Sequence, residues 1–401
     1  MWKKITGDVG LSISAIVIYN GCIQLLLYPM LEKQMGAVAF GVVLAFVSVM
    51  AIMASSFGTG CNYARMVNNM RETDCNGDYQ IILGMISFLA IPVSVIACFC
   101  IEQGNFIQLP GIILLMIVTM WRYYSDVDFR LRLDYKGFFL FYLLIAIGYG
   151  IGACIYSWTD SWILAFLLGE AAALVFVFYK GTIYEKPWFR KSKLYKESLK
   201  SCMLLSASNL LSALSLHLDR LLILWLIDAK AVTIFYAATL VGKIIALLTV
   251  PLNSIIISYL AKYKEKINGI FYTKIAGGLL MVALGFEVIS VGVSDLFVKW
   301  MYADVFTLVQ PLFWLANAGQ IMFFVTSTLM VVALKFMHEK YQVYLNLIYI
   351  ILYLLISVPA TMFAGVWGMG WAILSVNVIR FILAFSVGIY QIKRTMKDER
   401  N

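Results

Sequence analysis

Six charged side chains lie inside long apolar stretches of this sequence, where a charge is costly. They are Glu170, Asp219, Arg220, Lys243, Glu287 and Arg380. An ionisable group inside a membrane-length apolar segment needs a partner or a water-filled cavity. Arginine and lysine in such places can bind phosphate, whereas a carboxylate can pair with a cation. These residue types therefore indicate ligand binding or ion coupling.

The segment 203–226 has two distinct faces when drawn as a helix. Its polar face consists of Ser208, Ser212, Ser215 and Asp219, flanked by Asn209 and Arg220. Leucines occupy the opposite arc, so one side is expected in lipid and the other against protein or water. Two interpretations stay open, because serines can permit close helix packing and can also line a cavity.

Other apolar segments carry similar polar groups. Lys243 either pairs with Glu170 or Asp219 as a structural bridge, or contacts an anionic substrate. Asn377 precedes Arg380 by three residues. The predicted substrate-binding set is Arg220, Lys243, Arg380, Asp219, Asn20, Gln24, Asn209 and Asn377, with Glu170 and Glu287 as candidate ion-coupling residues.

The composition specifies the solvent that surrounds these groups. Of 401 residues, 62% are hydrophobic and 13% are charged, and the mean hydropathy is +0.87. Such a chain suits lipid, where helices satisfy every backbone polar group internally. We predict an all-α integral membrane protein with about 12 transmembrane helices. The expected spans are 9–29, 36–58, 80–101, 109–124, 137–156, 161–180, 203–226, 232–258, 271–292, 305–333, 342–362 and 367–390.

The distribution of lysine and arginine predicts the orientation. One side of the membrane receives most of them, including Arg130, Arg132 and Lys136 after the fourth span and Arg122 at its end, which we count with the same connection. The other side receives Lys33, Lys230 and Lys299. The positive-inside rule then places both termini in the cytoplasm. The net charge of +9 is spread over these short connections, which argues against nucleic-acid binding, and the cysteines and histidines show no metal-site spacing. We expect no metal and no cofactor.

A basic connection at the middle of the chain suggests two halves. The predicted domains are an N-terminal six-helix lobe (1–180), a basic cytoplasmic linker (181–202), a C-terminal six-helix lobe (203–390) and a cytoplasmic tail (391–401). Six spans on each side give the lobes the same orientation, as in transporters built from parallel repeats.

Several short segments are similar to a known family. They are Leu218-Asp219-Arg220-Leu221-Leu222-Ile223-Leu224, Ala231-Val232-Thr233-Ile234-Phe235-Tyr236-Ala237-Ala238, Phe40-Gly41-Val42 and the basic loop Phe129-Arg130-Leu131-Arg132-Leu133-Asp134-Tyr135-Lys136. With the span count, they resemble Wzx-type flippases of lipid-linked O-antigen repeat units, within the multidrug/oligosaccharidyl-lipid/polysaccharide exporter superfamily.

The resemblance implies two six-helix lobes around a central cationic cavity in a bacterial inner membrane. An undecaprenyl-diphosphate-linked oligosaccharide would cross from the inner to the outer leaflet by alternating access, for surface polysaccharide biosynthesis. Membrane lipid, a polysaccharide polymerase and a chain-length regulator are the further partners that it implies. Two alternatives stay open: a multidrug antiporter of the same superfamily, and a polysaccharide-modifying membrane enzyme. Short outer connections argue against the enzyme.

Overall fold

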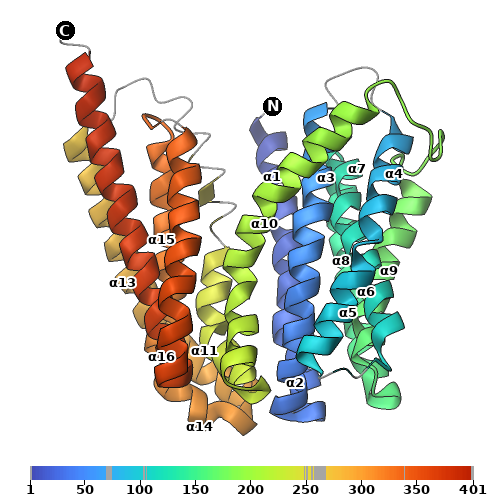
Figure 1. Ribbon diagram of the computed structural model, residues 1–401, viewed down its shortest axis with the longest axis horizontal. Coiled ribbons are helices and arrows are strands. Elements are labelled where there is room, and N and C mark those ends of the chain that lie inside the picture. Colours follow the sequence, from blue (N-terminus) through green and yellow to red (C-terminus); the bar gives the residue numbers. More distant parts are fainter. Residues whose placement is uncertain are drawn as a thin grey trace. The chain divides into compact units, whose positions relative to one another are not determined.

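The computed structural model describes residues 2–68, 75–102, 104, 106–247, 249, 252–253, 256, 268–337 and 339–398. All regular secondary structure in this part of the chain is helical (Figure 1). The chain divides into two compact units, Met1–Leu221 and Leu222–Asn401. The predicted lobes and linker stay a prediction. In the structure α10 begins at Tyr195, inside the predicted linker, and crosses the boundary between the units.

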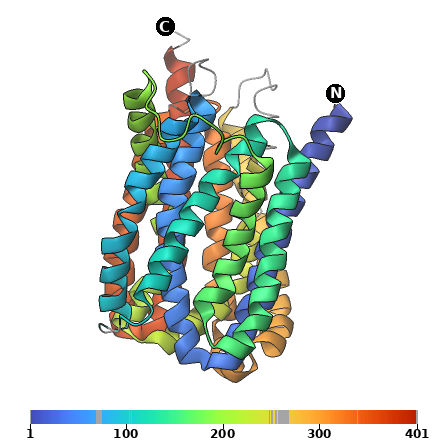
Figure 2. The same cartoon turned by 90° about the vertical axis from the view of Figure 1, so that its right-hand side faces the viewer.

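The first unit is a bundle of long helices that run side by side (Figures 1 and 2). Its elements are α1 (Trp2–Cys22), η1 (Ile23–Leu27), α2 (Tyr28–Met53), η2 (Ala54–Gly58), α3 (Thr59–Asn68), α4 (Asn76–Ser87), α5 (Ala90–Ile101), α6 (Leu109–Ser125), α7 (Val127–Leu131), α8 (Tyr135–Thr159), α9 (Trp162–Lys180) and most of α10 (Tyr195–Leu226). The η1 and η2 segments are single π-helical turns, which widen the helix locally.

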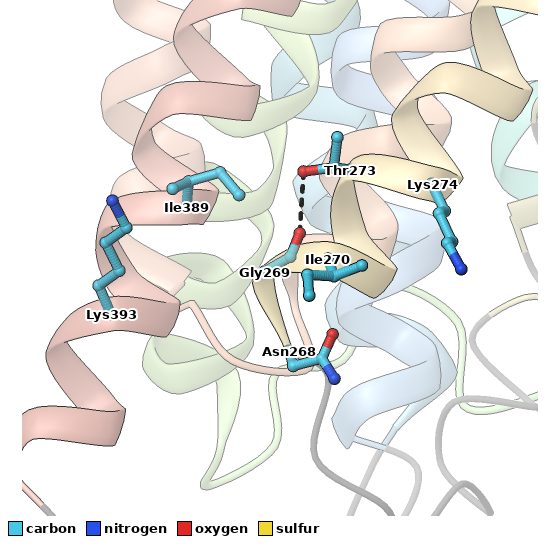
Figure 3. A pocket seen from close by; sticks show the side chains of 7 residues that line it. All are labelled: Asn268, Gly269, Ile270, Thr273, Lys274, Ile389 and Lys393. Carbon is cyan, nitrogen blue, oxygen red and sulfur yellow. Dashed lines mark hydrogen bonds between the residues drawn. The ribbon is translucent and has the colours of Figure 1, made fainter.

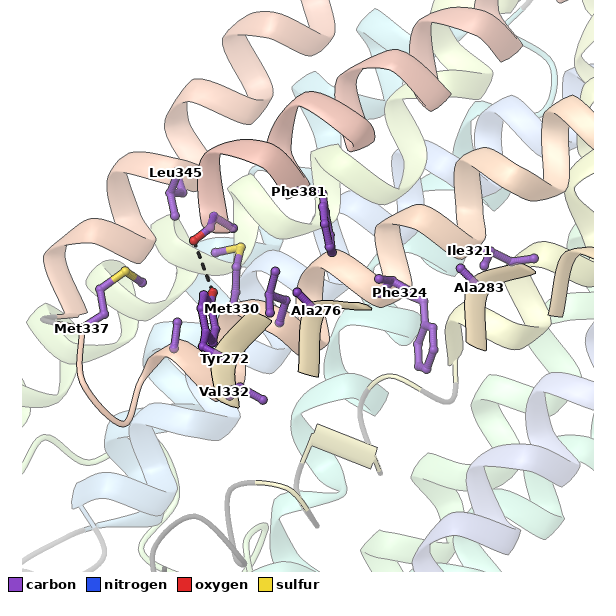
Figure 4. Close-up of a cluster of buried hydrophobic side chains, with 14 of the residues drawn as sticks. Tyr272, Ala276, Ala283, Ile321, Phe324, Met330, Val332, Met337, Leu345 and Phe381 are labelled. Carbon is purple, nitrogen blue, oxygen red and sulfur yellow. Dashed lines mark hydrogen bonds between the residues drawn. The ribbon is translucent and has the colours of Figure 1, made fainter. Parts of the chain in front are cut away.

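In the second unit, the described residues form four long helices and a short connection. Its elements are α11 (Ala229–Leu247), α13 (Gly269–Met301), η3 (Ala303–Val305), α14 (Phe306–Val309), η4 (Gln310–Leu312), α15 (Phe313–Ala333) and α16 (Glu339–Asp398). Figure 4 shows the core around Tyr272, whose hydroxyl donates to the carbonyl oxygen of Ala384 at 3.3 Å. Phe385 stacks on the Tyr272 ring at 5.7 Å. Apolar packing and one satisfied phenol thus join α13 to α16.

Two glycines interrupt helical stretches that are much longer than a single membrane crossing requires. Gly36 has φ +80° within α2, and Gly365 has φ +58° within α16. Both values lie in the left-handed region that glycine adopts without a steric penalty. The predicted four- to six-residue gaps between spans at these places are therefore replaced by breaks centred on one glycine.

The predicted fold class is confirmed. Among the described residues, nine helical stretches are long and apolar enough to cross a membrane. Two of them, Gly10–Asn68 and Tyr344–Arg394, contain the breaks at Gly36 and Gly365. Leu109–Ser125 adds a helix of 17 residues, so about 12 spans are present. Most of residues 248–258, the last part of the predicted span 232–258, lies outside the described residues.

Small residues bring α8 and α9 into close contact. A Cβ atom on Gly148 would lie 2.5 Å from the Cα of Gly169, and one on Gly152 would lie 2.8 Å from the Cα of Ala165. Membrane helices commonly use such residues to bring backbones together. This contact fixes α9 and with it Glu170, the buried carboxylate of that helix.

Candidate functional site

Glu170 forms a buried ion pair with Arg122 inside the first unit. The Nε of Arg122 donates to Oε2 of Glu170 at 2.6 Å, and Nη2 donates to Oε1 at 3.0 Å. The Tyr149 hydroxyl donates to the same Oε1 at 2.5 Å, and the Arg122 Nη2 also reaches the Tyr19 hydroxyl at 3.0 Å. Both charged side chains are 2–3% exposed. The pair joins α6, α9, α8 and α1.

This arrangement corrects two sequence predictions. Arg122 is not in an inner connection, because α6 continues to Ser125 and buries it. Glu170 has Arg122 as its ion-pair partner, so Lys243 is not needed to neutralise it. The predicted span 109–124 contained Arg122, which lies between the aromatic residues Trp121 and Tyr123, yet its charge was counted with the following connection. That aromatic flank was the available signal that the helix continues.

Asn20 and Gln24 lie at the junction of α1 and η1. The Asn20 amide donates to the carbonyl oxygen of Ile16 at 2.8 Å. Gln24 belongs to the π-turn, and its buried Oε1 has no hydrogen-bond partner within the described structure. Both side chains are half-buried. A side chain that bonds to the preceding turn, followed by a widened turn, marks this part of α1 as locally irregular, as functional segments often are.

Asp219 and Arg220 are both buried near the end of the first unit. The Arg220 Nη1 donates to the Ser48 hydroxyl at 3.4 Å, which connects α10 to α2. Tyr28 on α2 is another close neighbour of the Arg220 guanidinium. Neither Ser48 nor Tyr28 was predicted as a partner, because single hydroxyls in apolar spans are common and give no pattern in the sequence.

The close packing of α10 does not use its serine stripe. Ser208 and Ser212 are exposed, and Asn209 is half-buried. The contact with α3 is made instead by Ser206, whose Cα would lie 2.7 Å from a Cβ on Gly60. Within the first unit, the close packing of α10 thus uses Ser206 and not Ser208 or Ser212, and both interpretations of the stripe stay predictions.

Arg380 is a buried cation in the second unit. Its side chain is 7% exposed, and its Nη2 donates to Oδ1 of Asn346 at 2.8 Å. The guanidinium lies over the rings of Tyr349 and Phe323, at 4.6 and 5.2 Å. Nε and Nη1 have no hydrogen-bond partner in the described part of the chain, and no carboxylate there pairs with the group. A desolvated charge without a counter-ion costs several kcal/mol, on the order of a whole domain's margin.

Asn377 connects helices in the same unit. It lies one turn before Arg380 on α16, and its Nδ2 donates to the carbonyl oxygen of Gly319 at 3.2 Å and to that of Ile373 at 3.0 Å. Asn317 on α15 acts similarly, accepting from the Gly242 amide at 2.7 Å and donating to the Ser294 hydroxyl at 3.0 Å. These amides hold the helices around Arg380 in register.

Lys243 and Glu287 occupy different helices of the second unit. Lys243 is half-buried on α11. Glu287 is half-buried on α13, and both of its carboxylate oxygens lack a hydrogen-bond partner among the described residues. A carboxylate held in this way inside a membrane span is a candidate proton or cation site.

The second unit also has a cavity of about 610 Å³ at the start of α13. Its lining residues are Asn268, Gly269, Ile270, Thr273, Lys274, Ile389 and Lys393. Figure 3 shows Lys274 and Lys393 on opposite sides, on α13 and α16. The Asn268 side chain already accepts from the Phe271 amide at 2.8 Å, which caps the helix. None of the predicted site residues lines this cavity.

Comparison with solved structures reveals what the helices build. An inward-facing multidrug resistance MATE family transporter of the MOP superfamily superposes with a TM-score of 0.71 at 13% identity, covering 97% of this chain and 99% of that one. The lipid II flippase MurJ, in an inward closed conformation, gives 0.71 at 13% identity, covering 94% and 87%. The chain has the fold of these transporters. An outward-facing MATE structure matches with a TM-score of 0.59 at 15% identity, covering 98% and 96%.

No protein-family model and no curated protein matches the sequence. The MATE and MurJ fold therefore establishes the architecture, and identities this low carry no substrate with them. Within that fold, Arg122 and Glu170 of the first unit neutralise each other, whereas Arg380 of the second unit keeps two donor nitrogens without a hydrogen-bond partner among the described residues.

Proposed function

We propose that this protein is a flippase that moves an undecaprenyl-diphosphate-linked oligosaccharide repeat unit from the inner to the outer leaflet by alternating access. In this proposal it resides in a bacterial inner membrane and serves surface polysaccharide biosynthesis. The fold shared with the lipid II flippase MurJ and with MATE transporters supports it. The MATE neighbours include inward-facing and outward-facing conformations, as alternating access requires.

The physical task matches a membrane-embedded polar site. A glycan with many hydroxyls and a diphosphate cannot cross about 30 Å of hydrocarbon unaided. A protein that encloses the head group while the lipid tail stays in the bilayer removes that barrier. A membrane potential that is negative inside also favours outward movement of an anion, by about 2.3 kcal/mol per charge per 100 mV.

Arg380 is the observation that carries the proposal. The second unit retains a buried guanidinium with two unused donor nitrogens and no paired carboxylate among the described residues. Because an unpaired buried charge is costly, a ligand that supplies the missing anion gains the interaction that the protein alone lacks. Diphosphate oxygens suit the planar donor fork of arginine.

A multidrug antiporter is the second candidate, and Glu287 is the observation that favours it. Such a protein needs a carboxylate available to cations. Glu287 offers two oxygens without partners in the described structure, whereas Glu170 is neutralised by Arg122. In the flippase proposal the same Glu287 is the candidate coupling group, so its substitution alone does not separate the two functions.

Complementation in cells distinguishes the flippase from the antiporter. A strain that lacks this gene should regain its surface glycan with the wild-type protein and not with Arg380→Gln, at equal protein levels. Lys299→Gln, which removes an exposed charge of the same sign, is the matched control. Normal glycan in the deletion strain, with increased drug sensitivity instead, would establish the antiporter.

A further inference from the structure

A basic segment between α9 and α10 is held firmly against the first unit. We call residues 181–194 the basic strap. The Asp78 carboxylate, fully buried at the start of α4, accepts from the Ser192 amide at 2.7 Å and from its hydroxyl at 2.5 Å. The Asp128 carboxylate accepts from the Thr182 amide at 2.8 Å and from its hydroxyl at 2.9 Å. Both ends of the strap are therefore bonded to buried acids.

The middle of the strap is fixed as well. Gln80 accepts from the Phe189 amide at 3.1 Å. Gly77 leaves room for the strap, because a Cβ there would lie 2.5 Å from the backbone nitrogen of Arg190. Tyr184 is buried and stacks on Trp121 at 5.8 Å. Burial raises the pKa of the Tyr184 phenol above its ordinary value, so it stays neutral and shares a hydrogen bond with Ser125 at 2.7 Å.

The outward face of the strap carries exposed cations and aromatic rings. Its exposed cations are Lys186, Arg190, Lys191 and Lys193. Trp188 and Phe189 are 61% and 67% exposed. An exposed loop that needed only solubility would not display two large aromatic rings beside its charges. Aromatic rings with lysine and arginine are the residue types that meet lipid head groups.

The length of α9 sets the depth of the strap. At about 1.5 Å per residue, 19 residues cover about 28 Å, nearly the hydrocarbon thickness. The strap starts directly after the last residue of α9, Lys180, and therefore lies at the level of the head groups. The positive-inside rule makes this the cytoplasmic leaflet, whose surface is anionic.

We propose that the basic strap is a docking surface for anionic phospholipid head groups of the inner leaflet. Its backbone is fixed by Asp78, Asp128 and Gln80, so the cations are presented without a large ordering cost on binding. Trp188 and Phe189 enter the interface while the cations contact the phosphates. This inference does not depend on the identity of the transported substrate.

Site-specific photocrosslinking in the full-length protein tests it. Trp188→p-benzoylphenylalanine is reconstituted into vesicles of equal parts phosphatidylglycerol and phosphatidylcholine, and the crosslinked lipids are identified by mass spectrometry. We expect phosphatidylglycerol to be enriched about fivefold or more. The control is Trp158→p-benzoylphenylalanine, an 88% exposed site at the far end of α8, which should show no enrichment.

Charge variants complete the test. K186Q/R190Q/K193Q should abolish the enrichment without lowering thermal stability, because these side chains are exposed and the strap is held through backbone and buried groups. K33Q/K230Q/K299Q removes the same charge elsewhere and should leave the enrichment intact. Equal labelling of both lipids, no lipid labelling, or crosslinking in cells to a cytoplasmic protein instead would overturn the proposal.

Discussion

Nε of Arg122 lies 2.6 Å from Oε2 of Glu170, between α6 and α9, with both side chains buried in the first unit. Tyr149 and Tyr19 supply further hydrogen bonds, so the pair is satisfied by the protein itself. Arg380 differs, because no carboxylate among the described residues pairs with it and two of its nitrogens have no hydrogen-bond partner there.

The buried ion pair should be essential to stability as a pair. Arg122→Met leaves Glu170 charged and unpaired, and we expect a loss of about 3–5 kcal/mol, seen as a lower thermal midpoint in detergent. The double variant R122M/E170M should recover most of that loss, because it buries no charge. A neutral effect of Arg122→Met alone would contradict the pairing.

The contact between α3 and α10 predicts a steric effect at Gly60. Gly60→Ala places a methyl group 2.7 Å from the Cα of Ser206, and should cost about 1–3 kcal/mol. Gly84→Ala, in a helix position with open space around it, should be neutral or stabilise by up to about 1 kcal/mol. Thermal unfolding of the two single variants, measured side by side, checks the packing. Equal changes in stability would refute the close contact at Gly60.

Removing the acid that holds the strap should release it. Asp78→Ala deletes two hydrogen bonds that Ser192 donates to the carboxylate, each worth about 1.5–3 kcal/mol. We expect trypsin to cleave after Arg190, Lys191 or Lys193 at least tenfold faster in the intact protein. Asp304→Ala, at an exposed site, is the control. Unchanged cleavage would mean that Asp78 does not hold the strap.

Arg380 and Asn377 should respond in opposite ways to substitution. Arg380→Met removes an unpaired buried charge, so stability should be unchanged or higher while transport is lost. Asn377→Ala removes two helix-connecting hydrogen bonds and should lower stability by about 1–3 kcal/mol. Melting curves of both variants distinguish the roles. Destabilisation by Arg380→Met would assign Arg380 to the fold instead.

Sequence patterns predicted the helices well and the partners poorly. Apolar runs of membrane length gave the spans, because lipid imposes that length on every helix. At Gly36 and Gly365 we had predicted connections of four to six residues between spans. The structure has a break at a glycine instead, because a left-handed glycine can redirect the chain without a loop. Arg122 was assigned to a connection because charge marks span ends on average, and its burial depends on Glu170, distant in sequence.

The candidate site shows the same limit. Periodicity identified the two faces of α10, yet it could not tell that Ser206 would pack on Gly60 while Ser208 stays exposed. Whether a polar face packs or lines a cavity depends on which helix lies opposite, and helical periodicity carries no such information. Arg380 was predicted as a site residue from its charge inside an apolar span. That two of its nitrogens lack a hydrogen-bond partner among the described residues emerged only from the structure.

Translocation measured with purified protein tests the central claim most directly. Full-length protein is reconstituted into vesicles with an undecaprenyl-diphosphate-linked oligosaccharide that carries a fluorophore on the glycan, and an impermeant reductant reports the exposed fraction over time. We predict rapid exchange between leaflets with the wild-type protein, and a rate about 10- to 100-fold lower with Arg380→Gln. A wild-type rate equal to that of protein-free vesicles, or an Arg380→Gln rate equal to wild type, would contradict the account.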